Sequence, residues 1–141
     1  MESVPWEQGD LRWVFPELAD TGPVAAALAE AGAGLRQLGG ELVYHQLLGV
    51  ASLGGHVERA GREFVVSLAC PRRCAWELRW GPPWQVVAEV TAGDAVLAER
   101  QSWYEEPLPA ARALAAAVAW LQGQEQELEQ EQEQEQASPV R

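Results

Sequence analysis

The chain has 141 residues, 48% of them hydrophobic, and a formal net charge of −11 at pH 7. This length fits one domain with a sizeable core. An acidic surface argues against binding to nucleic-acid phosphates or anionic membranes. The sequence contains no Lys, Asn or Ile, whose codons are AT-rich, and this indicates a GC-rich bacterial genome. The N-terminus lacks the features of a secretory signal and no run of about 18 apolar residues occurs, so we expect a cytoplasmic protein.

The first 20 residues predict an arm or a short strand packed on the domain. Leu11, Trp13 and Phe15 alternate with their neighbours, which is typical of a strand. Trp6 lies in a segment containing Pro and Glu that we expect to be irregular. The alternative is an arm that contacts a partner through its aromatic side chains.

Residues 21–39 predict the first helix. Asp20 or Thr21 can cap its start, Pro23 suits its first turn, and Gly39 with the next glycine favours its end. One apolar stripe runs along the segment and predicts a buried face. The stripe consists of Val24, Leu28, Ala31, Leu35 and Leu38.

Two strands are expected next. Residues 41–50 are rich in Leu, Val and Tyr and favour strand over helix. A turn at Ala60 and Gly61 would then form a hairpin that pairs Val57 with Phe64.

Residues 64–90 predict three antiparallel strands joined by three-residue loops at 71–73 and 81–83. In this arrangement residues 64–70 pair with residues 74–80, which pair in turn with residues 84–90. Side chains alternate between the two faces of a strand, so one face becomes apolar throughout and the other mainly polar. The expected core face carries Phe64, Val66, Leu68, Cys70, Cys74, Trp76, Leu78, Trp80, Trp84, Val86, Ala88 and Val90.

A two-residue turn at 93–94 predicts a final strand, whose register would place Glu99, Gln101 and Trp103 on the apolar face near its edge. A half-buried carboxylate beside aromatic rings has a raised pKa and can act as an acid or base. Glu99, Gln101 and Tyr104 are therefore the candidate catalytic residues. The competing interpretation, which we favour, is that the strand twists away and leaves Glu99 solvated.

The second helix is predicted over residues 107–122, with an Ala-rich run after its first prolines. Its apolar stripe consists of Ala111, Leu114, Ala115, Val118 and Leu121, with Trp120 at one flank. Residues 123–141 hold six Glu and one Arg and few large apolar side chains, so we expect a disordered acidic tail. Glu and Gln could also continue the helix for some turns.

Cys70 and Cys74 form the most distinctive motif, a C-x3-C spacing. Zinc sites need further ligands near by, and His45 and His56 are distant in sequence. A disulfide or a redox switch is geometrically plausible, but two small apolar sheet residues are the favoured interpretation. We expect the tryptophans of the sheet to be core rather than base-stacking residues, and we expect no metal and no cofactor.

The predicted fold is α+β in two layers, an antiparallel meander of five or six strands with the N-terminal and C-terminal helices packed on one face. We divide the chain into an N-terminal arm or short strand (1–20), a single α+β domain (21–122) and an acidic tail (123–141). The order of strand, helix, meander and long helix loosely resembles the helix-grip ligand-binding fold. That resemblance implies a cavity between sheet and helix.

The leading hypothesis is a small non-enzymatic protein that binds another protein, because the sequence shows no catalytic signature. The candidate partner-binding residues are Trp6, Trp13, Arg72, Arg73 and Arg79. One alternative is a small-molecule-binding or enzymatic domain with a cavity beside the C-terminal helix. Another is an acidic mimic of nucleic acid, which requires carboxylates arranged in rows on the folded surface.

Overall fold

The computed structural model of the chain describes residues 2–11, 14, 21–47, 50–69 and 84–137. Its strands are β1 (Glu2–Pro5), β2 (Val43–Leu47), β3 (Val50–Arg59), β4 (Arg62–Ala69), β5 (Trp84–Ala92) and β6 (Ala95–Tyr104). The helices are α1 (Thr21–Leu38) and α2 (Pro107–Ala137), with a short 3-10 helix at Trp6–Gln8.

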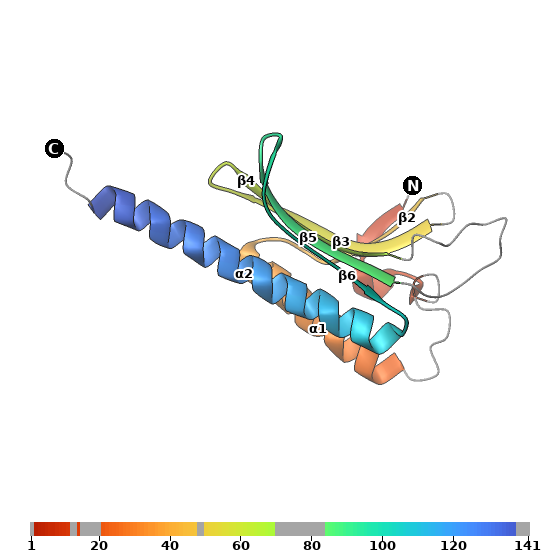
Figure 1. The fold of residues 1–141 in the computed structure, drawn as a ribbon. Helices are drawn as coiled ribbons and strands as arrows, with labels where there is room; N and C mark the ends of the chain where they lie inside the picture. The colour runs from red at the N-terminus through yellow and green to blue at the C-terminus, as the bar shows by residue number, and fades with distance from the viewer. Residues whose placement is uncertain (1, 12–13, 15–20, 48–49, 70–83, 138–141) are drawn as a thin grey trace.

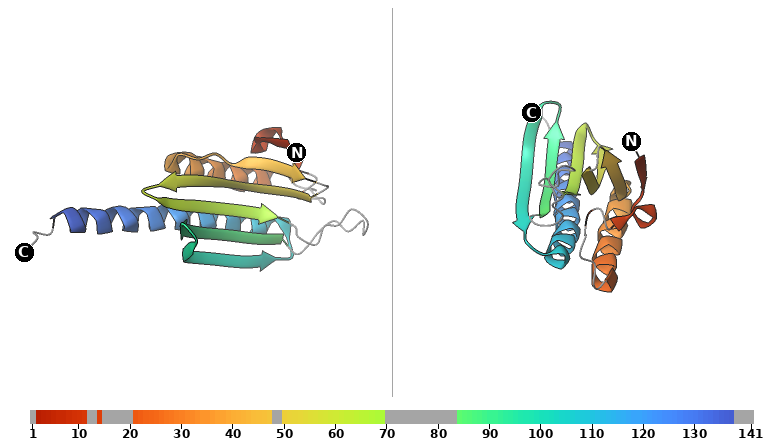
Figure 2. Two further views of the ribbon diagram at one scale, coloured as in Figure 1. Left: turned by 90° about the horizontal axis from the view of Figure 1, so that it is seen from above. Right: turned by 90° about the vertical axis from the view of Figure 1, so that its right-hand side faces the viewer.

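The six strands form one antiparallel sheet in the order β1-β2-β3-β4-β5-β6. Both helices lie side by side against the same face of this sheet (Figure 1, Figure 2). The predicted α+β class and the antiparallel meander with two helices are therefore confirmed. We call the opposite face of the sheet the outer face.

Helix α1 ends in a glycine cap. Gly39 has a φ of +96°, a backbone conformation that side chains disfavour. The N–H of Gly40 donates to the carbonyl of Leu35 at 2.8 Å, and the N–H of Gly39 donates to that of Arg36 at 3.0 Å. These two bonds form a Schellman motif, which satisfies carbonyls that the helix end would otherwise leave unpaired. The whole predicted stripe of α1 is buried.

The hairpin of β3 and β4 has the predicted register. Val57 lies opposite Phe64, and the turn between the strands is made by Ala60 and Gly61. Both turn residues have positive φ, +53° and +76°. Positive φ at both central positions is the property of a type I′ turn, whose twist matches that of the flanking strands.

The predicted pairing of residues 64–70 with residues 74–80 is wrong, because β4 pairs directly with β5. Phe64 lies opposite Val90, and Leu68 lies opposite Val86. Both arrangements bury the same side chains, so the alternation of apolar residues could not distinguish them. The predicted core face of β4 and β5 is confirmed, and residues 70–83 with their two expected loops lie outside the described residues.

A β-bulge overturns the predicted register of β6. Thr91 lies opposite Val96, but the next pair along the ladder is Val90 with Ala98. Leu97 is therefore an extra residue, and such an insertion moves every following side chain to the opposite face. The later pairs are Glu89 with Glu99, Val87 with Gln101, and Gln85 with Trp103.

The N-terminal strand lies earlier than predicted. Glu2–Pro5 pairs with β2, whereas Leu11 and Val14 are joined by a turn hydrogen bond of 3.0 Å. Val14 is fully buried, and its carbonyl accepts a hydrogen bond of 2.6 Å from the indole N–H of Trp84. A buried indole N–H needs such a partner. The predicted strand over residues 11–15 is thus wrong at these two residues.

Helix α2 continues beyond its predicted end at residue 122. Its predicted stripe packs against the sheet and α1. Leu128, about one turn after Glu125, is only 7% exposed. Nη1 of Arg59 lies 2.6 Å from Oε1 of Glu125, which ties the β3–β4 hairpin to this part of the helix. Glu and Gln have good helix propensity, so the segment can extend α2 to Ala137. Its C-terminal part projects beyond the sheet (Figure 1).

The two helices approach closely at Gly34. A Cβ atom on Gly34 would lie 2.7 Å from Cγ1 of Val118. The amide of Gln122 donates to the carbonyl of Gly34 at 3.0 Å and to the side chain of Gln37 at 2.8 Å.

In the described ranges, no helix combines the length and apolarity needed to span a membrane.

Candidate protein-interaction site

The outer face of the sheet carries the side chains that alternate with the core. It is the face seen in the left view of Figure 2, with the helices behind the strands. Its polar members are half-buried or exposed, because no other element covers them within the described residues. They include Ser3, His45, Ser52, His56, Glu58, Glu63, Ser67, Gln85, Glu89, Glu99 and Gln101.

Strand β6 is the last strand of the described sheet and pairs only with β5. The large hydrophobic residues exposed in the described ranges are Val96 at 55%, Leu97 at 47% and Trp103 at 51%, and all three belong to β6. We call the unpaired side of β6, with these three residues, the β6 edge. An edge strand also presents backbone N–H and C=O groups without partners. The edge therefore offers apolar area and hydrogen-bonding groups together.

Trp103 shows why the sequence did not predict an exposed apolar edge at β6. The unbulged register predicted Trp103 as core, whereas the structure places it opposite Gln85 on the outer face. Trp84, one strand away, is 2% exposed and follows the prediction. A tryptophan half-exposed on an edge strand is the kind of side chain that dominates protein interfaces.

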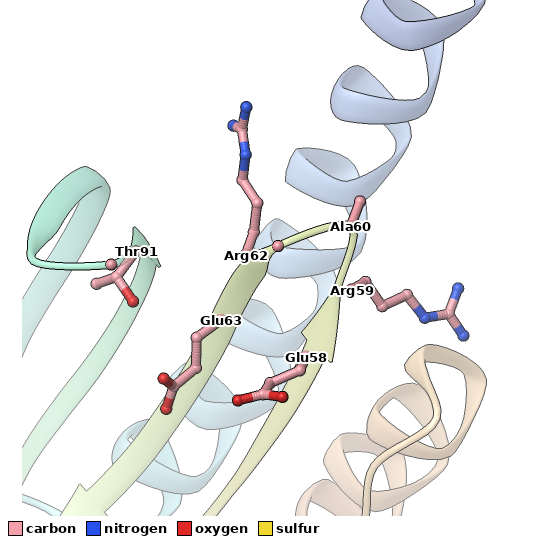
Figure 3. A pocket seen from close by; sticks show the side chains of 8 residues that line it. Glu58, Arg59, Ala60, Arg62, Glu63 and Thr91 are labelled. Carbon is pink, nitrogen blue, oxygen red and sulfur yellow. The ribbon is translucent and has the colours of Figure 1, made fainter.

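Four carboxylates cross the outer face toward the β6 edge. Glu58 lies opposite Glu63, and Glu89 lies opposite Glu99. Glu63 and Glu89 are diagonal neighbours on adjacent strands, a separation of about 7–8 Å in an antiparallel sheet. Figure 3 shows Glu58 and Glu63 side by side, with Arg59 pointing away from them. We call this set the carboxylate row.

Few positively charged side chains of the described residues lie near the carboxylate row. Nε2 of His56 lies 3.9 Å from Oε1 of Glu63, with both side chains about half-exposed, so this contact contributes little. The arginines of the described ranges occupy helices or helix-facing strand positions rather than the outer face. They are Arg36, Arg59, Arg62, Arg100 and Arg112. The described part of the outer face is therefore anionic.

Described residues of the sheet line two hollows. One, of about 520 Å³, lies between the tips of the two hairpins and is lined by residues 58–63 with Thr91 and Gly93 (Figure 3). The other, of about 470 Å³, is a shallow depression that contains His45 and His56. His45 lies opposite both Ser3 and Ser52 in the ladder. Both hollows are open to solvent, so neither supplies the water-excluded environment that strengthens catalytic groups.

The three candidate catalytic residues do not share one face of the sheet. The bulge places Glu99 and Gln101 on the outer face and Tyr104 on the helix-facing side, opposite Trp84. Neither of the two hollows described above is lined by Glu99, Gln101 or Tyr104. Among the described residues, no group of three His, Cys, Asp or Glu side chains is placed to hold a metal ion.

Of the predicted partner-binding residues, only Trp6 lies in the described ranges. Its side chain is partly buried and packs beside α1, where a Cβ atom on Gly32 would lie 3.3 Å from the indole nitrogen. Trp6 thus contributes to the attachment of the N-terminal segment. Trp13, Arg72, Arg73 and Arg79, together with Cys70 and Cys74, lie outside the described residues.

Comparison with known proteins gave no match to this chain. No family model, no curated protein and no solved structure is similar enough to carry an inference. The functional argument therefore depends on the geometry of the β6 edge and the outer face.

Proposed function

We propose that this chain is a small non-enzymatic module that binds another protein through the β6 edge. The observation that carries the proposal is that the large hydrophobic residues exposed in the described ranges, Val96, Leu97 and Trp103, all belong to one edge strand. Proteins normally protect sheet edges with charge, proline, short strands or a cover, because an exposed edge invites pairing with another chain. A ten-residue edge strand with three exposed large apolar side chains is the expected form of an edge used for contact.

Photo-crosslinking from the β6 edge tests this proposal in the native host. Trp103 is replaced by p-benzoylphenylalanine, and the matched control carries the same residue in place of Ala116, an exposed position on α2. We expect a protein captured from position 103 and not from position 116. Capture from neither position, or equally from both, would contradict binding at the β6 edge.

The carboxylate row favours one second candidate, an acidic mimic of nucleic acid that occludes a basic protein surface. It is supported by four carboxylates on a face whose described positions carry no arginine. In that case the captured partner should itself bind nucleic acid, and an added DNA or RNA duplex should compete with the chain. A partner that is displaced by neither duplex contradicts the mimic and leaves the edge-binding proposal intact.

A further inference from the structure

The part of β6 beyond the bulge has two chemically different sides. Glu99, Gln101 and Trp103 face outward, whereas Ala98, Arg100, Ser102 and Tyr104 face the helix layer. A strand added beside β6 would continue both rows, since its own side chains alternate in the same way. The composition of each row therefore specifies what the added strand must carry on each side.

The outward side requires positive charge. Glu99 has Glu89 directly opposite it, and like charges in such a pair repel each other. An incoming strand provides Glu99 with a second cross-strand neighbour, and a Lys or Arg there would compensate this repulsion. Trp103, at the end of the same row, can contact a guanidinium or the alkyl stem of either residue.

The helix-facing side favours apolar residues of moderate size at its two ends. Ala98 and Tyr104 are partly buried against the core, whereas Arg100 between them is exposed. A neighbouring strand that placed polar side chains there would have to desolvate them. Alternation of basic and apolar residues is thus the pattern that fits both sides of β6.

A second copy of this chain fits less well. Each copy carries a net charge of −11, which opposes association. An antiparallel pair of β6 strands related by a two-fold axis at Glu99 or Arg100 would bring that residue opposite itself. Both registers that centre on the middle of the strand therefore create a pair of like charges.

We propose that the β6 edge binds an extended segment of a partner protein in which Lys or Arg alternates with apolar residues, and that the segment adds to the sheet as a seventh strand. This inference depends on the proposed function and specifies its partner. Backbone hydrogen bonds to β6 provide the common part of the affinity, and the outward basic residues select the sequence.

Selection from a library of displayed random ten-residue peptides tests the inference with the full chain as bait. We expect enriched peptides to carry Lys or Arg at every second position and to lack proline. In the enriched peptide, N-methylation of one alternate set of backbone amides should reduce affinity at least tenfold, and methylation of the other set should leave it within twofold. That asymmetry is the signature of a strand with one paired side.

A matched pair of variants tests the charge. Glu89→Gln with Glu99→Gln should weaken the enriched peptide about five- to tenfold at low salt, and less at high salt. Glu131→Gln with Glu133→Gln removes the same charge from the exposed end of α2 and should change affinity less than twofold. Equal effects of the two double variants would indicate general attraction to an acidic protein and would overturn the inference.

Several other outcomes would also count against the inference. Enrichment of neutral or acidic peptides, no enrichment, equal sensitivity to both methylation patterns, or concentration-dependent dimers lost on Trp103→Lys would each overturn it. If position 103 nevertheless crosslinks a protein of another chemistry, the inference fails while the proposed function stands. If position 103 crosslinks nothing, the proposed function fails as well.

Discussion

The β3–β4 and β5–β6 hairpins resemble each other at their turns and differ in their strands. Each reverses in a two-residue turn, at Ala60 and Gly61 in the first and at residues 93–94 in the second. The first keeps a regular register along its whole length, whereas the second gains an extra residue at Leu97. A single insertion thus distinguishes the regular hairpin from one whose last strand presents a tryptophan to solvent.

The largest expected effect comes from truncating a leucine in each hairpin. Leu68→Ala on β4 removes a side chain that is fully buried, and should lower the free energy of unfolding by about 2–5 kcal/mol. Leu97→Ala at the bulge should change it by less than about 0.5 kcal/mol, because that side chain is 47% exposed. Chemical denaturation of both variants measures the difference. Similar losses would show that the bulge leucine is core in solution.

The two tryptophans of the second hairpin should respond differently to the same substitution. Trp84→Phe leaves the buried carbonyl of Val14 without its donor and should cost about 1–3 kcal/mol. Trp103→Phe should be nearly neutral, since the side chain lies on the outer face. Thermal unfolding followed by circular dichroism measures both. A large loss for Trp103→Phe would contradict the bulged register.

The turns should respond in opposite directions. Gly93 has a φ of +61° and open space around it, so Gly93→Ala should cost about 1–2 kcal/mol through backbone strain alone. Ala60 already occupies φ +53°, where Asn is better tolerated, so Ala60→Asn should stabilise by about 0.5–1 kcal/mol. The midpoints of urea denaturation test both signs. Stabilisation by Gly93→Ala would exclude a positive φ at that residue.

The smallest expected effects concern the pairs of glutamates that face each other, of which each of these two hairpins has one. Glu58→Gln should relieve repulsion by Glu63, and Glu99→Gln should relieve repulsion by Glu89, each by about 0.2–0.5 kcal/mol at low salt. Both gains should disappear at high ionic strength, where exposed charges are screened. Denaturation at low and high salt separates this electrostatic effect from packing. A gain that persists at high salt would contradict it.

The alternation of apolar residues predicted the faces of β4 and β5 because one face is buried and the other is not. The same rule could not predict that these strands are adjacent, since both arrangements bury Phe64, Leu68 and Val86. Strand β6 contains little alternation, as Ala98, Arg100 and Ser102 differ too little in polarity from their neighbours to fix a face. The bulge, and with it the exposure of Trp103, therefore left no local signal.

Helix positions were predicted more successfully than strand neighbours. The stripes of both helices were apparent because a period of 3.6 residues is distinct from its alternatives. The extension of α2 depends on Leu128 and on the contact between Arg59 and Glu125, partners that lie 66 residues apart. Contacts of that kind are set by tertiary structure and are not contained in any short stretch of sequence.

The bond from Trp84 to Val14 also constrains the order in which the chain can assemble. Every sheet pairing from β2 to β6 joins neighbours along the chain, and such local topologies fold quickly. The carbonyl of Val14 instead accepts its hydrogen bond from a donor that lies 70 residues later in the sequence. During synthesis, Val14 would therefore gain this bond only after Trp84 has left the ribosome, whereas β1 can already pair with β2.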